Sequence, residues 1–149
     1  DLCPYAYGIV VTDCVLGWKV VYSGDTLPCA ALAEAGAGAT LAIHEATLED
    51  EMKAEATSKG HCTVSQALDI CANKMGAWRT LLTHFSQRYA QVPKLDPNIM
   101  AKLRHARAAV AFDLMSINFS RLRELPAVMP AIRELFAEEV ALLCSSDQR

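Results

Sequence analysis

Hydrophobic residues in the first part of the chain follow the pattern of a β-hairpin. Positions 8–14 and 18–23 are rich in β-branched and aromatic residues, and a short link containing Gly17 separates them. Such residues favour extended backbone, and glycine favours the turn that joins two strands. The pattern therefore predicts two adjacent strands connected by a short turn.

Capping residues and apolar spacing predict the elements that follow. Thr47 with Asp50 and Thr63 with Gln66 have the spacing of capping boxes, so we expect a helix to begin at each threonine. The predicted helices cover 29–35, 47–59, 63–75, 98–106 and 126–143, and the predicted strands cover 40–43, 78–83, 108–112 and 115–119. This mixture of strands and helices predicts an α/β fold.

Length and composition indicate one globular unit. The chain has 149 residues, of which 52% are hydrophobic and 21% charged, and this excludes a disordered tail. Gly, Pro, Ser and Thr interrupt the uncharged stretches before they could cross a bilayer, so we expect no membrane span. We expect residues 1–149 to form a single segment. The chain lacks an initiator Met and begins at Asp1, which favours a portion of a longer protein.

Charge is distributed unevenly along the chain. The net charge of −3 excludes nucleic-acid binding through the surface as a whole. Acidic residues dominate positions 25–55, whereas Arg and Lys dominate positions 79–107, where we expect a phosphate-bearing ligand to bind. The six cysteines have no CxxC spacing, and we interpret them as buried thiols in a reducing compartment.

Three of the predicted strands each end in polar or titratable side chains. Asp25 follows the strand ending at residue 23, His44 and Glu45 follow the next strand, and His84 follows the strand that ends at residue 83. Ligands of α/β sheets bind beyond the carboxyl ends of strands. The pattern therefore predicts a functional site that draws on all three strand ends.

Each candidate residue also has a structural interpretation. Asp25 could shape a turn, and Glu45 could be a solvated acid that opens a helix. His44 and His84 could be hydrogen-bonded core histidines, and His61 could be an exposed loop residue. No single residue decides between the two interpretations.

Five motifs, in order and spacing, resemble the carboxyl-terminal half of ribonuclease Z. The motifs are GDTLPC at 24–29, HEATLED at 44–50, KGHCT at 59–63, THFSQRYAQVP at 83–93 and AFDLM at 111–115. Ribonuclease Z is the tRNA 3′-processing endoribonuclease of the metallo-β-lactamase superfamily, and the eukaryotic long form is the more similar. The resemblance covers nearly the whole chain and implies the carboxyl-terminal half of an αββα fold.

The resemblance also implies a role for each motif residue. Asp25 matches the aspartate that bridges two Zn²⁺ ions, and His84 matches a histidine ligand of one of them. Glu45 and His61 match a relay that donates a proton to the leaving 3′-oxygen of precursor tRNA. These roles suit the chemistry, since a carboxylate can reach two metal ions and an imidazole can act as a general acid.

Two further residues, Thr63 and Arg88, are expected to contact phosphate groups of the precursor tRNA. For a eukaryotic long form, the resemblance implies the nucleus or the mitochondrion, and otherwise the cytoplasm.

The chain departs from the family pattern at three points. Cys62 stands where the family has Ser, and Leu2 stands where it has a zinc-ligand His. The HxHxDH motif, which supplies most zinc ligands, is absent. We therefore expect the N-terminal half of the same protein as a partner, and we expect this segment to be inactive alone.

Two alternatives to this function remain open. One is another hydrolase of the metallo-β-lactamase fold, acting on a nucleic acid or a small ester. The other is a catalytically dead binding or scaffold module, which would result if Leu2 truly replaces a ligand. The upstream sequence distinguishes them, because an intact HxHxDH motif favours the enzyme.

Overall fold

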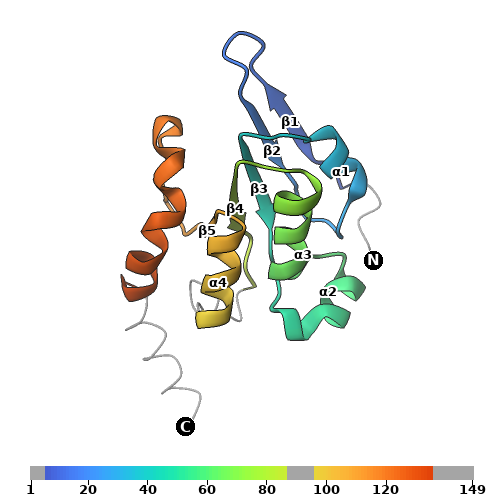
Figure 1. Ribbon diagram of the computed structural model, residues 1–149. Helices are drawn as coiled ribbons and strands as arrows, with labels where there is room; N and C mark the ends of the chain where they lie inside the picture. The colour runs from blue at the N-terminus through green and yellow to red at the C-terminus, as the bar shows by residue number, and fades with distance from the viewer. Residues whose placement is uncertain (1–5, 87–95, 136–149) are drawn as a thin grey trace.

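The fold is built on one five-stranded sheet (Figure 1). The computed structural model describes residues 6–86 and 96–135. The strands are β1 (Ile9–Thr12), β2 (Lys19–Tyr22), β3 (Leu41–Glu45), β4 (Arg79–Thr83) and β5 (Ala108–Val110), which lie in the order of the chain. The helices are α1 (Ala30–Ala35), α2 (Lys53–Lys59), α3 (Val64–Leu68) and α4 (Pro97–His105). The predicted α/β class is confirmed.

The predicted hairpin is present in β1 and β2. The two strands pair in antiparallel orientation. At the turn, Asp13 Oδ1 accepts hydrogen bonds from the backbone N–H groups of Val15 and Leu16. Gly17 has a φ of 75°, a conformation that glycine adopts without steric cost. Local residue choice therefore accounts for the hairpin.

The four strands from β2 to β5 run parallel to one another. β3 pairs with β2 on one side and with β4 on the other, and β5 pairs with β4. Helices return the chain between these strands, as parallel pairing requires. Among the described residues, the largest apolar side chains that are completely buried are those of Ile70, Leu82, Leu103 and Leu122. Because the strands are parallel, the carboxyl ends of β2, β3 and β4 meet at one edge of the sheet.

The helix expected to begin at Thr47 begins later. Residues 46–49 are not helical, and Leu48 forms an isolated parallel bridge with Thr63. The Glu45 carboxylate accepts hydrogen bonds from the backbone N–H and the hydroxyl of Thr47, which diverts that hydroxyl from capping a helix. Helical structure begins with a 3₁₀ turn at Asp50–Met52 and continues as α2.

The next helix begins where the sequence predicts. Thr63 and Gln66 form the capping box, each side chain bonding the backbone N–H of the other residue. The helix does not stay regular to its end, because α3 passes into a π-helical segment at Asp69–Lys74. Gly76 then turns the chain with a φ of 67°.

The last predicted strand is wrong, and the last helix differs from its prediction. Residues 115–118 are not extended in the sheet, because Leu114 has a φ of 64° and Met115 N–H bonds the Phe112 carbonyl in a turn. A 3₁₀ helix covers Phe119–Val128, and residues 129–135 are α-helical. The remainder of the predicted helix lies outside the described residues. In residues 6–86 and 96–135, no helix is long and apolar enough to cross a membrane.

Arg79, the first residue of the basic stretch, has a structural role. Its buried guanidinium donates hydrogen bonds to the backbone carbonyls of Leu122, Arg123 and Trp78. It also stacks over the Trp78 ring at 4.2 Å from the ring centroid. A guanidinium with these partners joins β4 to the 3₁₀ helix, and it does not present a free charge to a phosphate.

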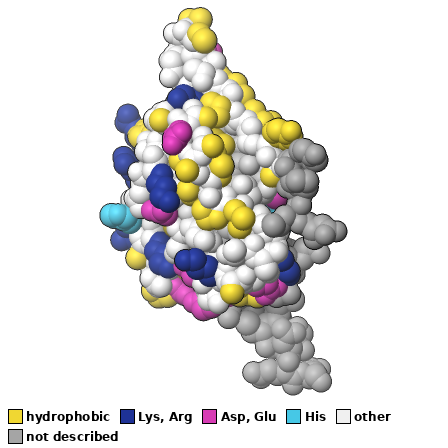
Figure 2. Space-filling model, turned by 90° about the vertical axis from the view of Figure 1, so that its right-hand side faces the viewer, with side chains coloured by type: hydrophobic (Ala, Val, Ile, Leu, Met, Phe, Trp, Pro, Cys, Tyr) yellow, Lys and Arg dark blue, Asp and Glu magenta, His cyan; other side chains and the backbone are white. Residues whose placement is uncertain are grey.

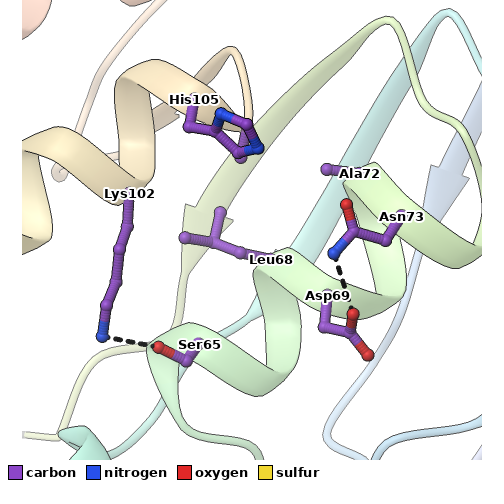
Figure 3. A pocket seen from close by; sticks show the side chains of 8 residues that line it. Ser65, Leu68, Asp69, Ala72, Asn73, Lys102 and His105 are labelled. Carbon is purple, nitrogen blue, oxygen red and sulfur yellow. Dashed lines mark hydrogen bonds between the residues drawn. The ribbon is translucent and has the colours of Figure 1, made fainter.

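Lys102 of α4 forms an ion pair with Asp50, in the 3₁₀ turn before α2, and a hydrogen bond with Ser65 of α3. Lys102 Nζ lies 2.6 Å from Asp50 Oδ2 and 2.8 Å from Ser65 Oγ, and the second contact is seen in the small pocket between α3 and α4 (Figure 3). Burial raises the pKa of the Asp50 carboxyl, but hydrogen bonds from Lys102, Ser65 and Thr63 outweigh it and lower that pKa to about 2. The network thus fixes the loop after β3 against two helices.

Lys102→Met is expected to lower the free energy of unfolding by about 1–2 kcal/mol above pH 4. The variant loses the contact that most lowers the pKa of Asp50, and partial exposure of Lys102 to solvent weakens that contact. A depressed carboxyl pKa stabilises the fold above the unfolded value of 3.8, and this stabilisation disappears as the pH falls toward 2. Urea unfolding at several pH values measures the difference. Lys74→Met, which removes an exposed ion pair with Asp69, is the control and is expected to change stability by less than about 1 kcal/mol. If the free energy of unfolding of the Lys102 variant is lower than that of the wild type by the same amount at pH 2 as at neutral pH, the prediction is wrong.

Candidate metal and proton-transfer site

The site lies at the edge of the sheet where β2, β3 and β4 end. Glu45 is the last residue of β3 and pairs with Thr83, the last residue of β4. His84 follows β4 directly, and Asp25 lies three residues beyond the end of β2. Parallel pairing therefore brings together residues that are far apart in the sequence, as the strand-end pattern predicts.

A glycine turn directs Asp25 into the site. Gly24 has a φ of 62°, and a Cβ atom at this position would lie 2.8 Å from the Tyr7 carbonyl oxygen. The backbone conformation at residue 24 disfavours a side chain there, and the Tyr7 carbonyl leaves no room for one. The turn after β2 depends on glycine, and the position of Asp25 depends on the turn.

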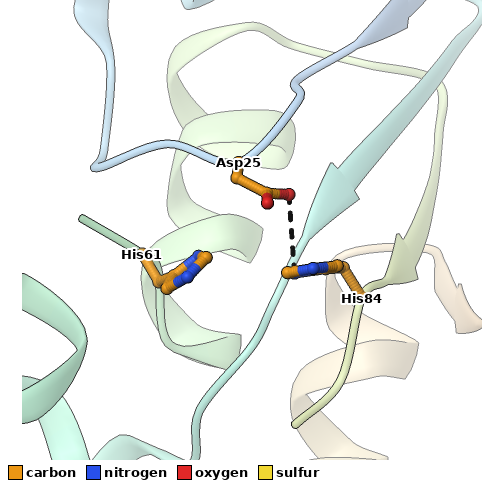
Figure 4. A group of neighbouring side chains, drawn as sticks. All are labelled: Asp25, His61 and His84. Atoms are coloured by element: carbon orange, nitrogen blue, oxygen red, sulfur yellow. Dashed lines mark ion pairs between the residues drawn. The ribbon is translucent and has the colours of Figure 1, made fainter. Parts of the chain in front are cut away.

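Asp25 and His84 are neighbours in space, as expected. Asp25 Oδ1 lies 3.5 Å from His84 Nδ1, and the two side chains are 54% and 47% exposed (Figure 4). His84 has a φ of 58°, which is uncommon for a residue with a side chain. Both donors are open to solvent, where an incoming ion could reach them. Their role as metal ligands stays a prediction.

Glu45 is the buried centre of the hydrogen-bond network. Its side chain is 1% exposed. Oε1 accepts a hydrogen bond from Thr26 N–H, and Oε2 accepts hydrogen bonds from the N–H and the hydroxyl of Thr47. These donors suit an ionised carboxylate, because they replace the water that burial removes. The interpretation of Glu45 as a solvated acid opening a helix is therefore wrong.

His61 is the partner of Glu45. Its Nδ1 lies 3.0 Å from Glu45 Oε1, and its side chain is 20% exposed, so the pair connects a buried acid to the surface. The expected hydrogen-bonding contact between the two residues is present. Their proton-transfer role stays a prediction. With Nδ1 facing Glu45, the second ring nitrogen, Nε2, is the one free to serve the site.

His61 also belongs to a cluster that could hold a metal ion. Asp25, His61 and His84 each offer a ligand atom, and these atoms all lie within 4.8 Å of one another. The two imidazole rings have centroids 5.4 Å apart (Figure 4). One carboxylate and two imidazoles are donors that Zn²⁺ accepts, so the described residues fit a zinc site. Sequence reasoning counted Asp25 and His84 as the metal ligands, and the structure adds His61 to the candidates.

Thr47 is a residue of the site that sequence reasoning missed. Its Oγ1 lies 2.7 Å from Glu45 Oε2, 2.9 Å from His84 Nδ1 and 3.3 Å from His61 Nδ1. The sequence signal was its position two residues after Glu45, but capping-box spacing pointed to a helix instead. A single hydroxyl thus contacts three of the four candidate site residues.

His44 and Cys62 are structural. His44 Nδ1 lies 2.7 Å from the Glu45 carbonyl oxygen, and burial lowers the pKa of this histidine, which favours its neutral form. The Cys62 thiol donates a hydrogen bond to the Thr26 carbonyl, and burial raises its pKa to about 12. Cys62 therefore supports the loop after Asp25 as an unreactive thiol.

Of the two residues expected to contact substrate phosphate, Thr63 and Arg88, the structure describes only Thr63. Thr63 is buried, and its hydroxyl accepts a hydrogen bond from Gln66 N–H as the cap of α3. The Thr63 hydroxyl is thus directed toward the helix, and this orientation does not support a contact with phosphate. The phosphate contact of Thr63 stays a prediction. Arg88 lies outside the described residues, as does Leu2.

Comparisons with known proteins identify relatives of the whole segment. The chain is 42% identical over 147 residues to a protein named tRNAse Z TRZ4, mitochondrial, of Arabidopsis thaliana. It is 46% identical over 138 residues to zinc phosphodiesterase ELAC protein 2 of Homo sapiens. Each alignment covers 93% of this chain, and the chain spans about 15–16% of the length of these two relatives. No family model matches the chain.

Solved structures agree with these relatives. A long-form RNase Z from yeast matches with a TM-score of 0.73 and 37% identity, covering 89% of this chain and 18% of that chain. The metallo-β-lactamase fold protein YhfI from Bacillus subtilis matches with a TM-score of 0.59 and 23% identity, covering 74% of this chain and 44% of that chain. The chain therefore has part of a metallo-β-lactamase fold, as the motifs imply.

Proposed function

We propose, because the chain belongs to the ribonuclease Z family, that it supplies part of the active site of a zinc-dependent endoribonuclease that removes the 3′ trailer from precursor tRNA. One observation carries the proposal. The Glu45–His61 pair lies beside the exposed donors Asp25 and His84, so a candidate proton donor adjoins a candidate metal site. Phosphodiester hydrolysis with a poor leaving group needs both.

The chain's own residues hold the proton for the leaving group. Glu45 is fixed by donors from Thr26 and Thr47 and in turn orients the His61 ring through Nδ1. With Nδ1 facing Glu45, Nε2 is the His61 nitrogen that remains to donate a proton. The oxygen of a water molecule bonds to phosphorus as the bond between phosphorus and the 3′-oxygen breaks. The proton on Nε2 passes to that 3′-oxygen, so the tRNA leaves with a 3′-hydroxyl and the trailer keeps a 5′-phosphate.

Asp25 and His84 would hold zinc. Zinc, when bound, supplies positive charge that stabilises the scissile phosphate and lowers the pKa of water. The donors that the described residues bring together are too few for two ions, because each ion needs about four ligands. We infer that two ions bind when the HxHxDH motif of an upstream half completes the set.

The exposed face of the hairpin supports such an upstream half. Large hydrophobic side chains are exposed on and around β1, and Figure 2 shows hydrophobic groups extending from the hairpin tip down one side of the molecule. The exposed large hydrophobics of this region are Tyr7, Ile9, Val10, Val11, Val15, Leu16 and Tyr22. Apolar patches of this kind mark surfaces that another part of a protein covers. We infer that residues 1–149 form one segment of a larger metallo-β-lactamase domain. We also infer that the N-terminal half of that domain packs on the exposed apolar face of the hairpin.

The relatives also suggest a compartment. The Arabidopsis protein carries the word mitochondrial in its name. We infer a mitochondrial location for the protein that contains this chain, and the family resemblance adds the nucleus as a second location. Imaging of the tagged full-length protein tests both.

The segment alone is expected neither to hold two zinc ions nor to cleave precursor tRNA, whereas the full-length protein does both. The reason is that residues 6–86 and 96–135 bring together only one carboxylate and two imidazoles as candidate zinc ligands. Metal analysis and a cleavage assay in added zinc, run on both proteins, provide the test, with circular dichroism as the control for folding. A full-length protein that binds zinc and tRNA without cleavage would identify a binding module instead. Cleavage of a small ester alone would identify another hydrolase of the fold.

A further inference from the structure

We propose that Thr47 is a positioning residue that holds His84 in the tautomer protonated at Nδ1, so that the Nε2 lone pair of His84 is free for a metal ion. The inference rests on the proposed function, because it concerns the metal site of that enzyme. It adds a residue whose backbone and side chain both contact the segment that carries His84.

The hydrogen bonds of Thr47 determine the tautomer. A threonine hydroxyl has one proton, and the Thr47 hydroxyl donates it to Glu45 Oε2 at 2.7 Å. An ionised carboxylate accepts hydrogen bonds and donates none. The Thr47 oxygen therefore acts as an acceptor toward His84 Nδ1, 2.9 Å away, and this nitrogen carries the proton.

Asp25 favours the same tautomer. Its Oδ1 lies 3.5 Å from His84 Nδ1, and a carboxylate oxygen also attracts a proton on that nitrogen. With Nδ1 protonated in the neutral ring, Nε2 is the unprotonated nitrogen. Histidine ligands of metals are commonly fixed in this way by a hydrogen bond at the other nitrogen.

The backbone at residues 46 and 47 holds the same segment. Ala46 N–H donates to the Thr83 carbonyl, and Ser86 N–H donates to the Thr47 carbonyl, each at 2.9 Å. These two bonds bracket His84, whose φ of 58° needs surrounding contacts to hold it. Thr47 thus holds the main chain after His84 with its carbonyl and the imidazole with its hydroxyl.

The test compares Thr47→Val with Thr47→Ser in the full-length protein. Valine keeps the shape and loses the hydroxyl, whereas serine keeps the hydroxyl. We expect Thr47→Val to weaken zinc affinity by about 10–100-fold in a chelator competition, and Thr47→Ser to stay within about threefold of the wild type. Thr57→Val, which removes an exposed hydroxyl on α2, is the matched control and is expected to bind zinc normally.

Several outcomes would overturn the inference. Unchanged zinc affinity in Thr47→Val would do so, and so would equal losses in the valine and serine variants, which would indicate packing rather than the hydroxyl. If the valine variant does not fold, ¹⁵N NMR of labelled histidine in the wild-type protein decides, and a His84 protonated at Nε2 in the metal-free neutral form contradicts the inference.

The same measurements separate this inference from the proposed function. A wild-type protein that does not cleave precursor tRNA, but loses zinc affinity on Thr47→Val, refutes the proposed function and retains the role of Thr47. A wild-type protein that cleaves, with zinc affinity unchanged in the valine variant, refutes the role of Thr47 alone.

Discussion

Replacing His61 by alanine in the full-length protein is expected to lower turnover on precursor tRNA by about 10²–10⁴-fold, while zinc content stays near that of the wild type. The reason is the contact between His61 Nδ1 and buried Glu45, which leaves Nε2 to donate a proton. Single-turnover cleavage and metal analysis of the same preparation measure the two quantities.

A matched variant makes the result specific. His105, at the end of α4, is exposed and is not a member of the cluster of Asp25, His61 and His84. His105→Ala is therefore expected to retain wild-type turnover. Loss of zinc in step with activity in His61→Ala would make His61 a metal ligand, an outcome that its place in the cluster makes chemically reasonable.

Asp25→Asn is expected to remove zinc as well as activity. An amide is a poor bridge between two cations, so we expect the variant to lose at least one zinc ion. We expect turnover to fall by about 10³-fold or more, which corresponds to about 4 kcal/mol in the barrier. Metal analysis after dialysis, together with the cleavage assay, tests both expectations.

The control for Asp25→Asn is Asp69→Asn. Asp69 is an exposed carboxylate that pairs with Asn73 and Lys74 and takes no part in the cluster. Its variant is expected to keep zinc and activity. A full complement of zinc in Asp25→Asn would show that the carboxylate does not hold the metal, and the assignment of Asp25 would then be wrong.

Local sequence signals predicted the parts of the fold that depend on neighbouring residues. The β-branched runs and Gly17 predicted the hairpin, and Thr63 with Gln66 predicted the start of α3. Both depend on contacts within a few residues, where side-chain chemistry determines the backbone. The same signal failed at Thr47, because its hydroxyl bonds the carboxylate of Glu45 and not a helical N–H.

The sequence predicted which residues form the candidate site better than it predicted how these residues are arranged. Strand-end positions and motif resemblance identified Asp25, Glu45, His61 and His84 from the sequence, and parallel pairing brings the three strand ends together. Which nitrogen of each histidine faces which oxygen depends on distances across the sheet edge. No spacing along the chain encodes those distances.

Residue choice and periodicity along the chain specify the α/β class, the hairpin, the cap of α3 and the identities of the strand-end residues. Only in the folded protein does Thr47 contact the site, and only there is the Arg79 guanidinium buried away from the basic stretch. Both depend on segments distant in the chain, since Thr47 contacts His84 and Arg79 bonds the carbonyls of Leu122 and Arg123. A polar side chain takes the partners that folding brings within reach once water is excluded, and those partners exist only when the chain has folded.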